Sequence, residues 1–344
     1  MEIIVPTDQD THTRDGMSLW SGSLPTLGDV FRARRVIARY LAPTPLLDAE
    51  KLSERLGVTT YVKCENLHPI GAFKVRGGVY LLSRLSAEER ARGVVGASTG
   101  NHGQSVAWAA RAFETQATIF VPEGANPLKV ASMERLGATV IARGRDFDEA
   151  LVGAREFSER EGAHFIHSAN EPDLIAGVAT ATLEMLEAQP DIEAIFVPIG
   201  GGSGLCGATL VAKALNPDIQ VIGVQAEGAP AVYESWRDRE LKSLDRADTF
   251  AEGVATRVAF EMPAAMLWGK VDEIMLVSDA ELRQAILTML ETTAMLAEGA
   301  GAAALAGLHQ RRNDFAGRKV GIVLSGGNLT LERLGEALTK ERAW

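Results

Sequence analysis

Short apolar runs alternate with stretches of helical periodicity along most of this chain, and that alternation limits the possible folds more than any other feature. Helical periodicity occurs at residues 105–113, 172–188 and 280–297, among other places. The strand-like runs between such stretches are Thr59–Lys63, Val94–Ala97, Ala117–Val121, Thr139–Ala142, Phe165–His167, Ala194–Ile199, Gln220–Gln225, Ile274–Val277 and Val320–Leu324. Alternation of this kind requires mainly parallel sheets with helices on both faces. The strands are too many for one sheet, so the sequence predicts two three-layer α/β domains with twisted, mainly parallel sheets.

Several helix ends are marked by their own residues. The first helical pattern begins at Leu27 and ends before Pro43. Ser278 and Glu281 form a capping box at the start of a later helix, and Asn328 or Thr330 can cap the last one. Residues 6–24 are polar and aperiodic, so we expect a flexible N-terminal arm over residues 1–24.

Charge and cysteine content exclude several classes of partner. The 344 residues carry a net charge of −10, with no basic run or basic–aromatic cluster, so neither nucleic acid nor an anionic membrane surface is expected to bind. The start of the chain lacks the features of a signal peptide, and no apolar run reaches membrane-spanning length, which predicts a cytoplasmic location. Cys64 and Cys206 have no CxxC spacing, so both are expected to be buried thiols in a reducing compartment.

A glycine-rich segment, Pro198–Gly207, follows one of the apolar runs and opens a helical one. Consecutive glycines let several backbone N–H groups point at one anion, and the helix that follows adds its dipole. The segment therefore predicts a phosphate site. Gly202, Gly204 and Gly207 also satisfy G-x-G-x-x-G, with Glu227 at the end of the next predicted strand. A dinucleotide site is the competing interpretation.

Lys74 lies between small and apolar residues in the segment Glu65–Gly78, where a strand-like run gives way to a helical one. Desolvation lowers the pKa of a lysine, and a neutral amine can form a Schiff base. The alternative is a structural lysine at a helix start, whose stem packs while its charged end stays in water.

Two further polar segments also follow predicted strands. Ser98–Gln104 combines hydroxyls, an amide and the N–H groups of a helix start, which can bind a carboxylate. Ser325–Asn328 by itself is typical of a turn followed by a helix cap. Ligands of α/β folds bind at the carboxyl ends of strands, and all four segments are expected there.

Together the four segments resemble the fold-type II pyridoxal-phosphate enzymes, and within them the threonine/serine dehydratase group, which also contains serine racemase. The resemblance runs from about Pro25 to Thr330 and includes Glu298–Ala303. It implies a tryptophan synthase β-like fold, with a large cofactor-binding domain from residues 25–58 and 156–344. It also implies a small mobile domain from residues 59–155, with Lys74 at the cleft between the two domains.

The resemblance implies a role for each matching residue. Lys74 would hold pyridoxal 5'-phosphate as a Schiff base and then act as the base that removes the α-proton of the substrate. The other cofactor contacts would be Phe73 against the ring, Asn101 to the ring hydroxyl oxygen, Ser325 at the pyridine nitrogen, Glu298 near the ring, and Gly200, Gly201, Gly202, Ser203 and Gly204 around the phosphate. An amino-acid substrate would bind through Ser98, Thr99, Gly100, Asn101 and His102, with Gly253 in a loop that lines the pocket.

The expected reaction is α,β-elimination on a 3-hydroxy amino acid, such as L-threonine, L-serine or a bulkier β-substituted serine, to give a 2-oxo acid and ammonia. A serine at the pyridine nitrogen does not keep that nitrogen charged, which favours expulsion of the β-hydroxyl over a long-lived carbanion. The hydroxyl of Thr99 leaves racemisation possible, and β-replacement uses the same cofactor. A nicotinamide-dependent oxidoreductase and a non-catalytic nucleotide-binding protein are more distant alternatives.

Other properties follow from matching or mismatching positions. Metal-dependent members of the group have carboxylates where this chain has Gln225 and Ala231, so no divalent metal site is expected. The resemblance implies a homodimer or a higher homo-oligomer. The sequence leaves the substrate's side chain and stereochemistry open.

Overall fold

The computed structural model describes residues 19–344 and divides into two compact units. Unit 1 contains residues 19–24, 45–64 and 182–344, and unit 2 contains residues 25–44 and 65–181. Most of the predicted N-terminal arm, residues 1–24, lies outside the described residues. The domain boundaries expected from the sequence stay a prediction.

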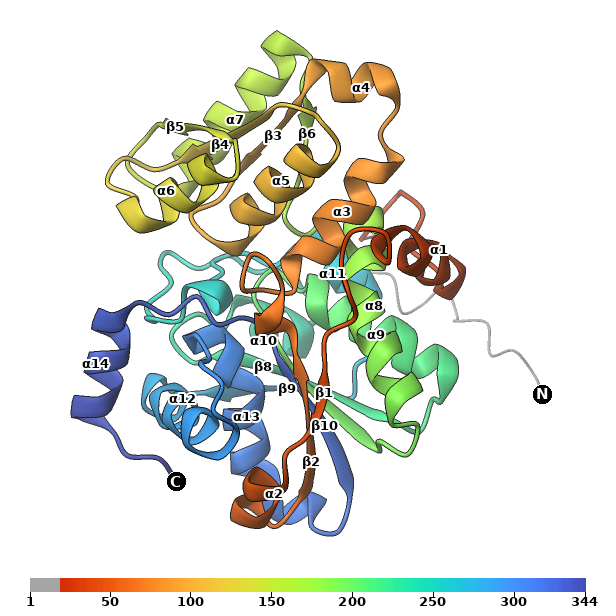
Figure 1. Cartoon of the computed structure of the whole chain (residues 1–344), viewed down its shortest axis with the longest axis vertical. Coiled ribbons are helices and arrows are strands. Elements are labelled where there is room, and N and C mark those ends of the chain that lie inside the picture. The colour runs from red at the N-terminus through yellow and green to blue at the C-terminus, as the bar shows by residue number, and fades with distance from the viewer. Residues whose placement is uncertain (1–18) are drawn as a thin grey trace. The chain divides into compact units, whose positions relative to one another are not determined.

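A six-stranded sheet forms the centre of unit 1 (Figure 1). Neighbouring strands are parallel, except that the edge strand β1 runs antiparallel to β2. The strand order is β1 (Leu46–Asp48), β2 (Thr59–Cys64), β10 (Lys319–Leu324), β7 (Ala194–Pro198), β8 (Gln220–Ala226) and β9 (Glu273–Val277).

Helices cover both faces of the six-stranded sheet. One face packs on α13 (Gly299–Arg311), whose buried surface consists largely of alanine and glycine and so allows a close approach to the strands. On the other face, Gly223 lies against Leu205 and Gly321 lies against Met185. The remaining helices of the unit are α2 (Glu50–Leu56), α9 (Ser203–Leu215), α10 (Ala231–Asp238), η3 (Glu252–Val254), α11 (Glu261–Leu267), α12 (Asp279–Thr293), η4 (Arg312–Phe315) and α14 (Leu331–Lys340).

Unit 2 contains a parallel four-stranded sheet. Its strands, in spatial order, are β5 (Thr139–Ala142), β4 (Ala117–Val121), β3 (Val94–Ala97) and β6 (His164–Phe165). Alternate residues of β3 and β4 enter two separate cores, as a pleated strand requires. The helices are α1 (Leu27–Ile37), η2 (Glu65–Leu67), α3 (Lys74–Arg84), α4 (Ala87–Arg92), α5 (Asn101–Ala112), α6 (Pro127–Arg135) and α7 (Phe147–Glu161), and α8 (Pro172–Ala188) begins in unit 2 and ends in unit 1.

The predicted fold class is confirmed, and each predicted strand overlaps an observed one. The capping box of Ser278 and Glu281 is present, and Thr330 caps α14. Both cysteines are buried. Within residues 19–344, no helix combines the length and the apolar content needed to cross a membrane.

Some boundaries differ from the prediction. The helix predicted over 280–297 ends at Thr293, because Ala294 adopts a left-handed conformation with φ 59°. Helix α5 begins at Asn101, so the end of the segment Ser98–Gln104 is helical. Strand β1 was not predicted, since three residues are too few to show an alternating pattern.

The crossing of α3 and α8 gives a stability prediction. A Cβ atom on Gly177 would lie 2.7 Å from the Arg76 carbonyl oxygen and 2.8 Å from the Gly77 Cα, so Gly177→Ala forces two backbones apart. We expect a loss of about 1–3 kcal/mol, measured as a lower urea midpoint. Gly335→Ala is the matched control: no atom lies within 4 Å of its Cβ position in α14, and the change should stabilise that helix. Equal midpoints for Gly177→Ala and the wild type would contradict the close crossing.

Candidate active site

The loop 200–204 in unit 1 has the geometry of an anion site. It connects the carboxyl end of β7 to the start of α9, and its Gly202 has a left-handed φ of 100° that disfavours any side chain. A Cβ atom on Gly200 would lie 2.3 Å from the carbonyl oxygen of Gly253, so this position must also be bare. The first N–H groups of a helix have no acceptor within that helix and lie at its positive dipole end. Loop and helix start together therefore have the features that a phosphate site requires.

A series of close contacts connects Gly253, which touches this loop, with the segments that carry other predicted site residues of unit 1. The Cβ position of Gly253 lies 2.7 Å from the Ala300 side chain, near the start of α13. The Glu298 N–H donates to the Gly326 carbonyl oxygen at 3.1 Å. Ser325, which follows the last residue of β10, is buried. Because β7 and β10 are parallel neighbours, their carboxyl ends bring these segments to one edge of the sheet.

In unit 2, Lys74 is the first residue of α3 and is half-buried, with buried Ala72 and Val75 on either side of the Phe73–Lys74 pair. Its Nζ lies 3.4 Å from the Ser168 carbonyl oxygen, to which it donates, and 5.3 Å from the centre of the Phe73 ring. Its own carbonyl oxygen accepts a hydrogen bond of 2.6 Å from Ser105 Oγ. The backbone of Lys74 is thus attached directly to α5.

The segment Ser98–His102 leads from β3 into the same helix α5. The Gly100 N–H donates to Ser98 Oγ at 3.1 Å, and Gly100 caps α5 without a side chain. Since Ser105 of α5 binds Lys74, unit 2 combines the candidate amine and the candidate carboxylate site on one packed pair of helices, α3 and α5.

His102 is buried beside these residues. Burial, and then the positive charge of Lys74, lower the pKa of His102 to about 3. The imidazole is therefore neutral at physiological pH. It adds no positive charge to the candidate carboxylate site.

Residues 167–171, after β6, form part of the site that the sequence patterns did not reveal. His167 Nδ1 accepts the N–H groups of Ala169 and Asn170 at 3.0 and 2.9 Å, which closes the turn that presents the Ser168 carbonyl to Lys74. The Glu171 carboxylate accepts the His167 N–H at 3.2 Å, and burial raises the pKa of Glu171 to about 7. The available signal was position alone, because polar residues that follow a parallel strand lie at its ligand-binding edge.

Gln225 and Ala231 are the two positions from which the sequence predicts that a divalent metal site is lacking. Gln225 Oε1 accepts the Tyr233 N–H at 2.9 Å, and Ala231 begins α10. In the part of the chain that the structure describes, no three His, Cys, Asp or Glu side chains gather as metal ligands would. The lack of a divalent metal stays a prediction.

The structure thus groups the predicted residues by unit. Unit 1 brings together Gly200, Gly201, Gly202, Ser203, Gly204, Gly253, Glu298 and Ser325, and unit 2 brings together Phe73, Lys74, Ser98, Thr99, Gly100, Asn101 and His102. The individual roles of these residues stay predictions.

Comparisons with known proteins show which family the chain resembles. The family model of the pyridoxal-phosphate dependent enzymes matches residues 37–326. The chain is 40% identical to an L-threonine ammonia-lyase of Thermotoga maritima, over 92% of this chain and 78% of that protein. It is 36% identical to an L-threo-3-hydroxyaspartate ammonia-lyase of Saccharomyces cerevisiae, over 90% of this chain and 95% of that protein.

A solved structure shows the same fold. The processed form of threonine deaminase isoform 2 from Solanum lycopersicum superposes with a TM-score of 0.86 at 31% identity, over 93% of this chain and 95% of that chain. The resemblance drawn from the four sequence segments is therefore confirmed. The chain belongs to the family of pyridoxal-phosphate-dependent enzymes and has their type II fold.

Proposed function

We propose that this enzyme is an ammonia-lyase, which converts a 3-hydroxy amino acid to a 2-oxo acid and ammonia. The observation that carries the proposal is the hydrogen bond from Ser105 Oγ to the backbone carbonyl oxygen of Lys74. This hydrogen bond joins the residue that carries the half-buried amine to the helix whose start can bind a carboxylate. An enzyme that acts on an α-amino acid needs both a reacting amine and a carboxylate site. The two ammonia-lyases that resemble the chain over most of its length support the same reaction.

The residues of unit 1 fit pyridoxal phosphate. The bare cradle at 200–204 accepts a phosphate, since a side chain on Gly200 would collide with Gly253. The buried Ser325 hydroxyl can hydrogen-bond to an uncharged pyridine nitrogen. Pyridoxal phosphate, when bound, supplies a sink for the electrons left on the substrate α-carbon.

Unit 2 supplies the reacting amine and the substrate carboxylate site in this proposal. Lys74 would hold the cofactor through its amine, and the Lys74 amine, once the substrate has displaced it, would take the proton from the α-carbon. The hydroxyls of Ser98 and Thr99 and the N–H groups of Gly100 and Asn101 hold the substrate carboxylate. The Asn101 amide also donates to the ring hydroxyl oxygen of the cofactor, and Phe73 packs against its ring.

Ser325 favours elimination over reactions that need a long-lived carbanion. A carboxylate at that position would keep a pyridine nitrogen protonated, whereas a neutral hydroxyl does not. The electrons therefore leave with the β-hydroxyl. Lys74, protonated in the first step, can return its proton to that hydroxyl, so that water departs. Water then hydrolyses the remaining enamine, off the enzyme, which gives the 2-oxo acid and releases ammonia.

The proposal also includes the partners, the cellular location and the oligomeric state of the enzyme. The net charge of −10 and the lack of a basic run support an enzyme that acts on a small amino acid without a nucleic-acid partner. The two buried thiols, which form no disulfide, support a cytoplasmic location. The homodimer or higher homo-oligomer implied by the resemblance is part of the same proposal.

A second candidate activity, racemisation, is favoured by one observation. Thr99 places a hydroxyl in the segment that leads into α5, in the same unit as Lys74. A hydroxyl on the face of the substrate opposite the lysine could return a proton to the α-carbon. The nicotinamide and nucleotide-binding alternatives gain no support from the family match.

The main test replaces Lys74. Borohydride should fix the cofactor on Lys74 of the wild-type protein, as mapped by mass spectrometry. Lys74→Ala should lower 2-oxo acid formation by about 10²- to 10⁴-fold with L-threonine, L-serine and L-threo-3-hydroxyaspartate, because the general base is lost. Lys51→Ala, on the exposed face of α2, is the control and should keep wild-type activity. Unchanged ammonia release by Lys74→Ala would refute the proposed function.

Thr99 separates the two candidate activities. Thr99→Ala should abolish any interconversion of enantiomers and leave 2-oxo acid formation within about 10-fold of the wild type, since the Ser98 hydroxyl and the N–H groups of Gly100 and Asn101 still hold the substrate carboxylate. Thr99→Ser keeps the hydroxyl and should keep both activities. Chiral chromatography and keto-acid detection measure them in one reaction. Racemisation that persists in Thr99→Ala would show that another group serves the opposite face.

The lowered pKa of His102 predicts a pH effect on stability. Below pH 6.5 the unfolded chain binds a proton at His102, which the folded protein binds only near pH 3, so the free energy of unfolding falls as the pH decreases through this window. Glutamine does not bind a proton in the folded or the unfolded chain. The His102→Gln variant should therefore lose less thermal stability than the wild type between about pH 7.5 and about pH 5. Its KM should stay near the wild-type value, because a neutral ring contributes no charge. Parallel decreases in unfolding temperature would argue against a buried neutral imidazole.

A further inference from the structure

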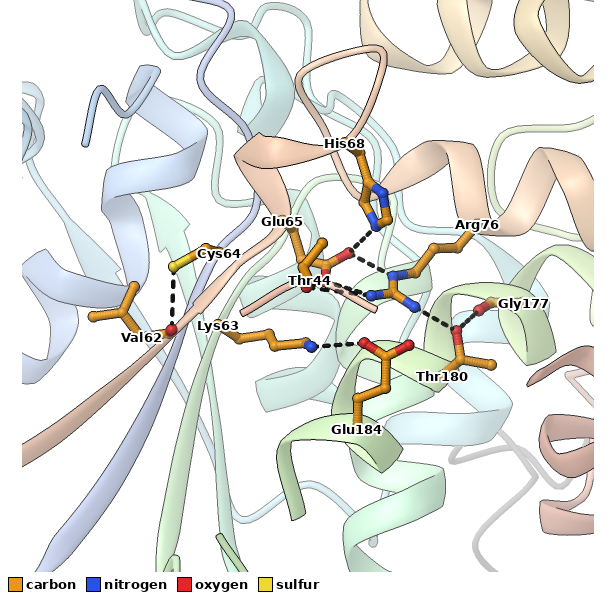
Figure 2. A network of polar contacts seen from close by, with 10 residues as sticks. All are labelled: Thr44, Val62, Lys63, Cys64, Glu65, His68, Arg76, Gly177, Thr180 and Glu184. Atoms are coloured by element: carbon orange, nitrogen blue, oxygen red, sulfur yellow. Dashed lines mark hydrogen bonds and ion pairs between the residues drawn. The ribbon is translucent and has the colours of Figure 1, made fainter. Parts of the chain in front are cut away.

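A buried ion pair joins the two ends of the segment that carries Lys74 (Figure 2). The Glu65 carboxylate accepts hydrogen bonds from Arg76 Nε at 2.7 Å and from Arg76 Nη2 at 2.9 Å. Both side chains are completely buried, and the two residues are 11 positions apart. Arg76 lies in the first turn of α3, two residues after Lys74.

Neighbouring side chains satisfy most of the remaining polar atoms of this pair. Thr44 Oγ1 donates to Glu65 at 2.6 Å, and His68 Nε2 lies 3.2 Å from the same carboxylate. Arg76 Nη1 donates to Thr180 Oγ1 at 3.1 Å, and the Thr180 hydroxyl donates to the Gly177 carbonyl oxygen at 2.7 Å. Burial favours a neutral carboxyl, but the charges and hydrogen bonds of Arg76 and His68 hold the pKa of Glu65 well below its usual range.

The stability of the fold does not by itself explain why this ion pair is buried. Removing two charges from water costs several kcal/mol for each ion, and well-packed apolar residues often replace a buried pair without loss of stability. What the pair does provide is a fixed geometry, because a bidentate arginine–carboxylate contact tolerates little rotation.

The geometry that the pair fixes is that of Lys74. Between Glu65 and Arg76 the chain passes through a turn, with Gly71 in a left-handed conformation, before α3 begins at Lys74. On one side the pair anchors this segment, and on the other side Ser105 Oγ binds the Lys74 carbonyl oxygen. The backbone of Lys74 is therefore held at two points, which leaves only its side-chain torsions free.

We infer that Glu65 and Arg76, with Thr44 and Thr180, form a clamp that positions Lys74 for its reaction. The inference rests on the proposed function, because it assigns the clamp to the reacting amine. Glu65 and Arg76 are positioning residues, which act through the backbone of Lys74. A displacement of about 1 Å at a reacting group can lower a rate by about 10²-fold, so loosening the clamp affects kcat before it affects stability.

The test uses variants that weaken the clamp by different amounts. Arg76→Lys keeps the charge and loses the bidentate geometry, Glu65→Gln removes the charge, and Thr180→Val removes the hydroxyl that accepts a hydrogen bond from Arg76 Nη1. Each should lower kcat of the holoenzyme by about 10-fold or more and change KM by less. Thr180→Ser restores the hydroxyl and should restore kcat. The acetylation rate of the Lys74 amine in the cofactor-free protein, mapped by mass spectrometry, should also change in the variants that lower kcat.

Phe157→Ala is the control for a general loss of stability. Phe157 belongs to unit 2, packs edge-on against Phe120 at 5.8 Å and lies outside the clamp. This variant should lower the unfolding temperature and keep both the wild-type kcat and the wild-type acetylation rate of Lys74.

Three results overturn the clamp. One is a wild-type kcat and Lys74 acetylation rate in folded Arg76→Lys and Thr180→Val proteins. Another is a kcat that follows the unfolding temperature in the same proportion as in Phe157→Ala. The third is a Thr180→Ser kcat as low as that of Thr180→Val. If Glu65→Gln does not fold, the comparison of Thr180→Val with Thr180→Ser decides. Failure of the proposed function can be told apart from failure of the clamp, because borohydride would then fix no cofactor on Lys74 of the wild-type protein.

Discussion

Parallel strands bring all their carboxyl ends to one edge of a sheet, and the candidate site of this enzyme depends on that constraint. In unit 1, β7 and β10 are neighbours, so the phosphate loop and Ser325 lie at the same edge. In unit 2, β3 and β6 are neighbours, and they deliver Ser98–His102 and the turn at 167–171 to another such edge. Segments far apart in the sequence thereby become adjacent without any direct pairing of side chains.

Within unit 1, the site is held by backbone contacts that exclude side chains. Gly200 approaches Gly253, and Gly301 approaches Gly326, so closely that a Cβ atom on Gly200 or Gly301 would lie 2.3 or 2.1 Å from a carbonyl oxygen. Such contacts leave no room for a side chain at either position. Close packing therefore requires glycine at these positions, and a bare loop is also what the proposed phosphate site requires.

Within unit 2, electrostatics differ from one group to the next. His102 is buried and neutral, and burial raises the pKa of Glu171 to about 7. Glu65 and Arg76 are equally buried, and the many hydrogen bonds of this pair hold the pKa of Glu65 low. The unit thus holds a charged pair in the clamp and a neutral imidazole at His102, although all three side chains are buried.

The sequence by itself determined the strands, their alternation with helices, the capping box at Ser278 and the identity of Lys74 and of the glycine loop, because each is encoded by residues that are close together in the chain. It could not show β1, whose three residues have no period of their own, nor the turn at His167, which shortens the predicted strand. It could not show the clamp either. Glu65 and Arg76 meet across 11 positions, and their partners Thr44 and Thr180 come from still more distant segments. Only the tertiary structure decides such contacts, since a buried charge needs every hydrogen-bonding partner in place and no local pattern specifies them.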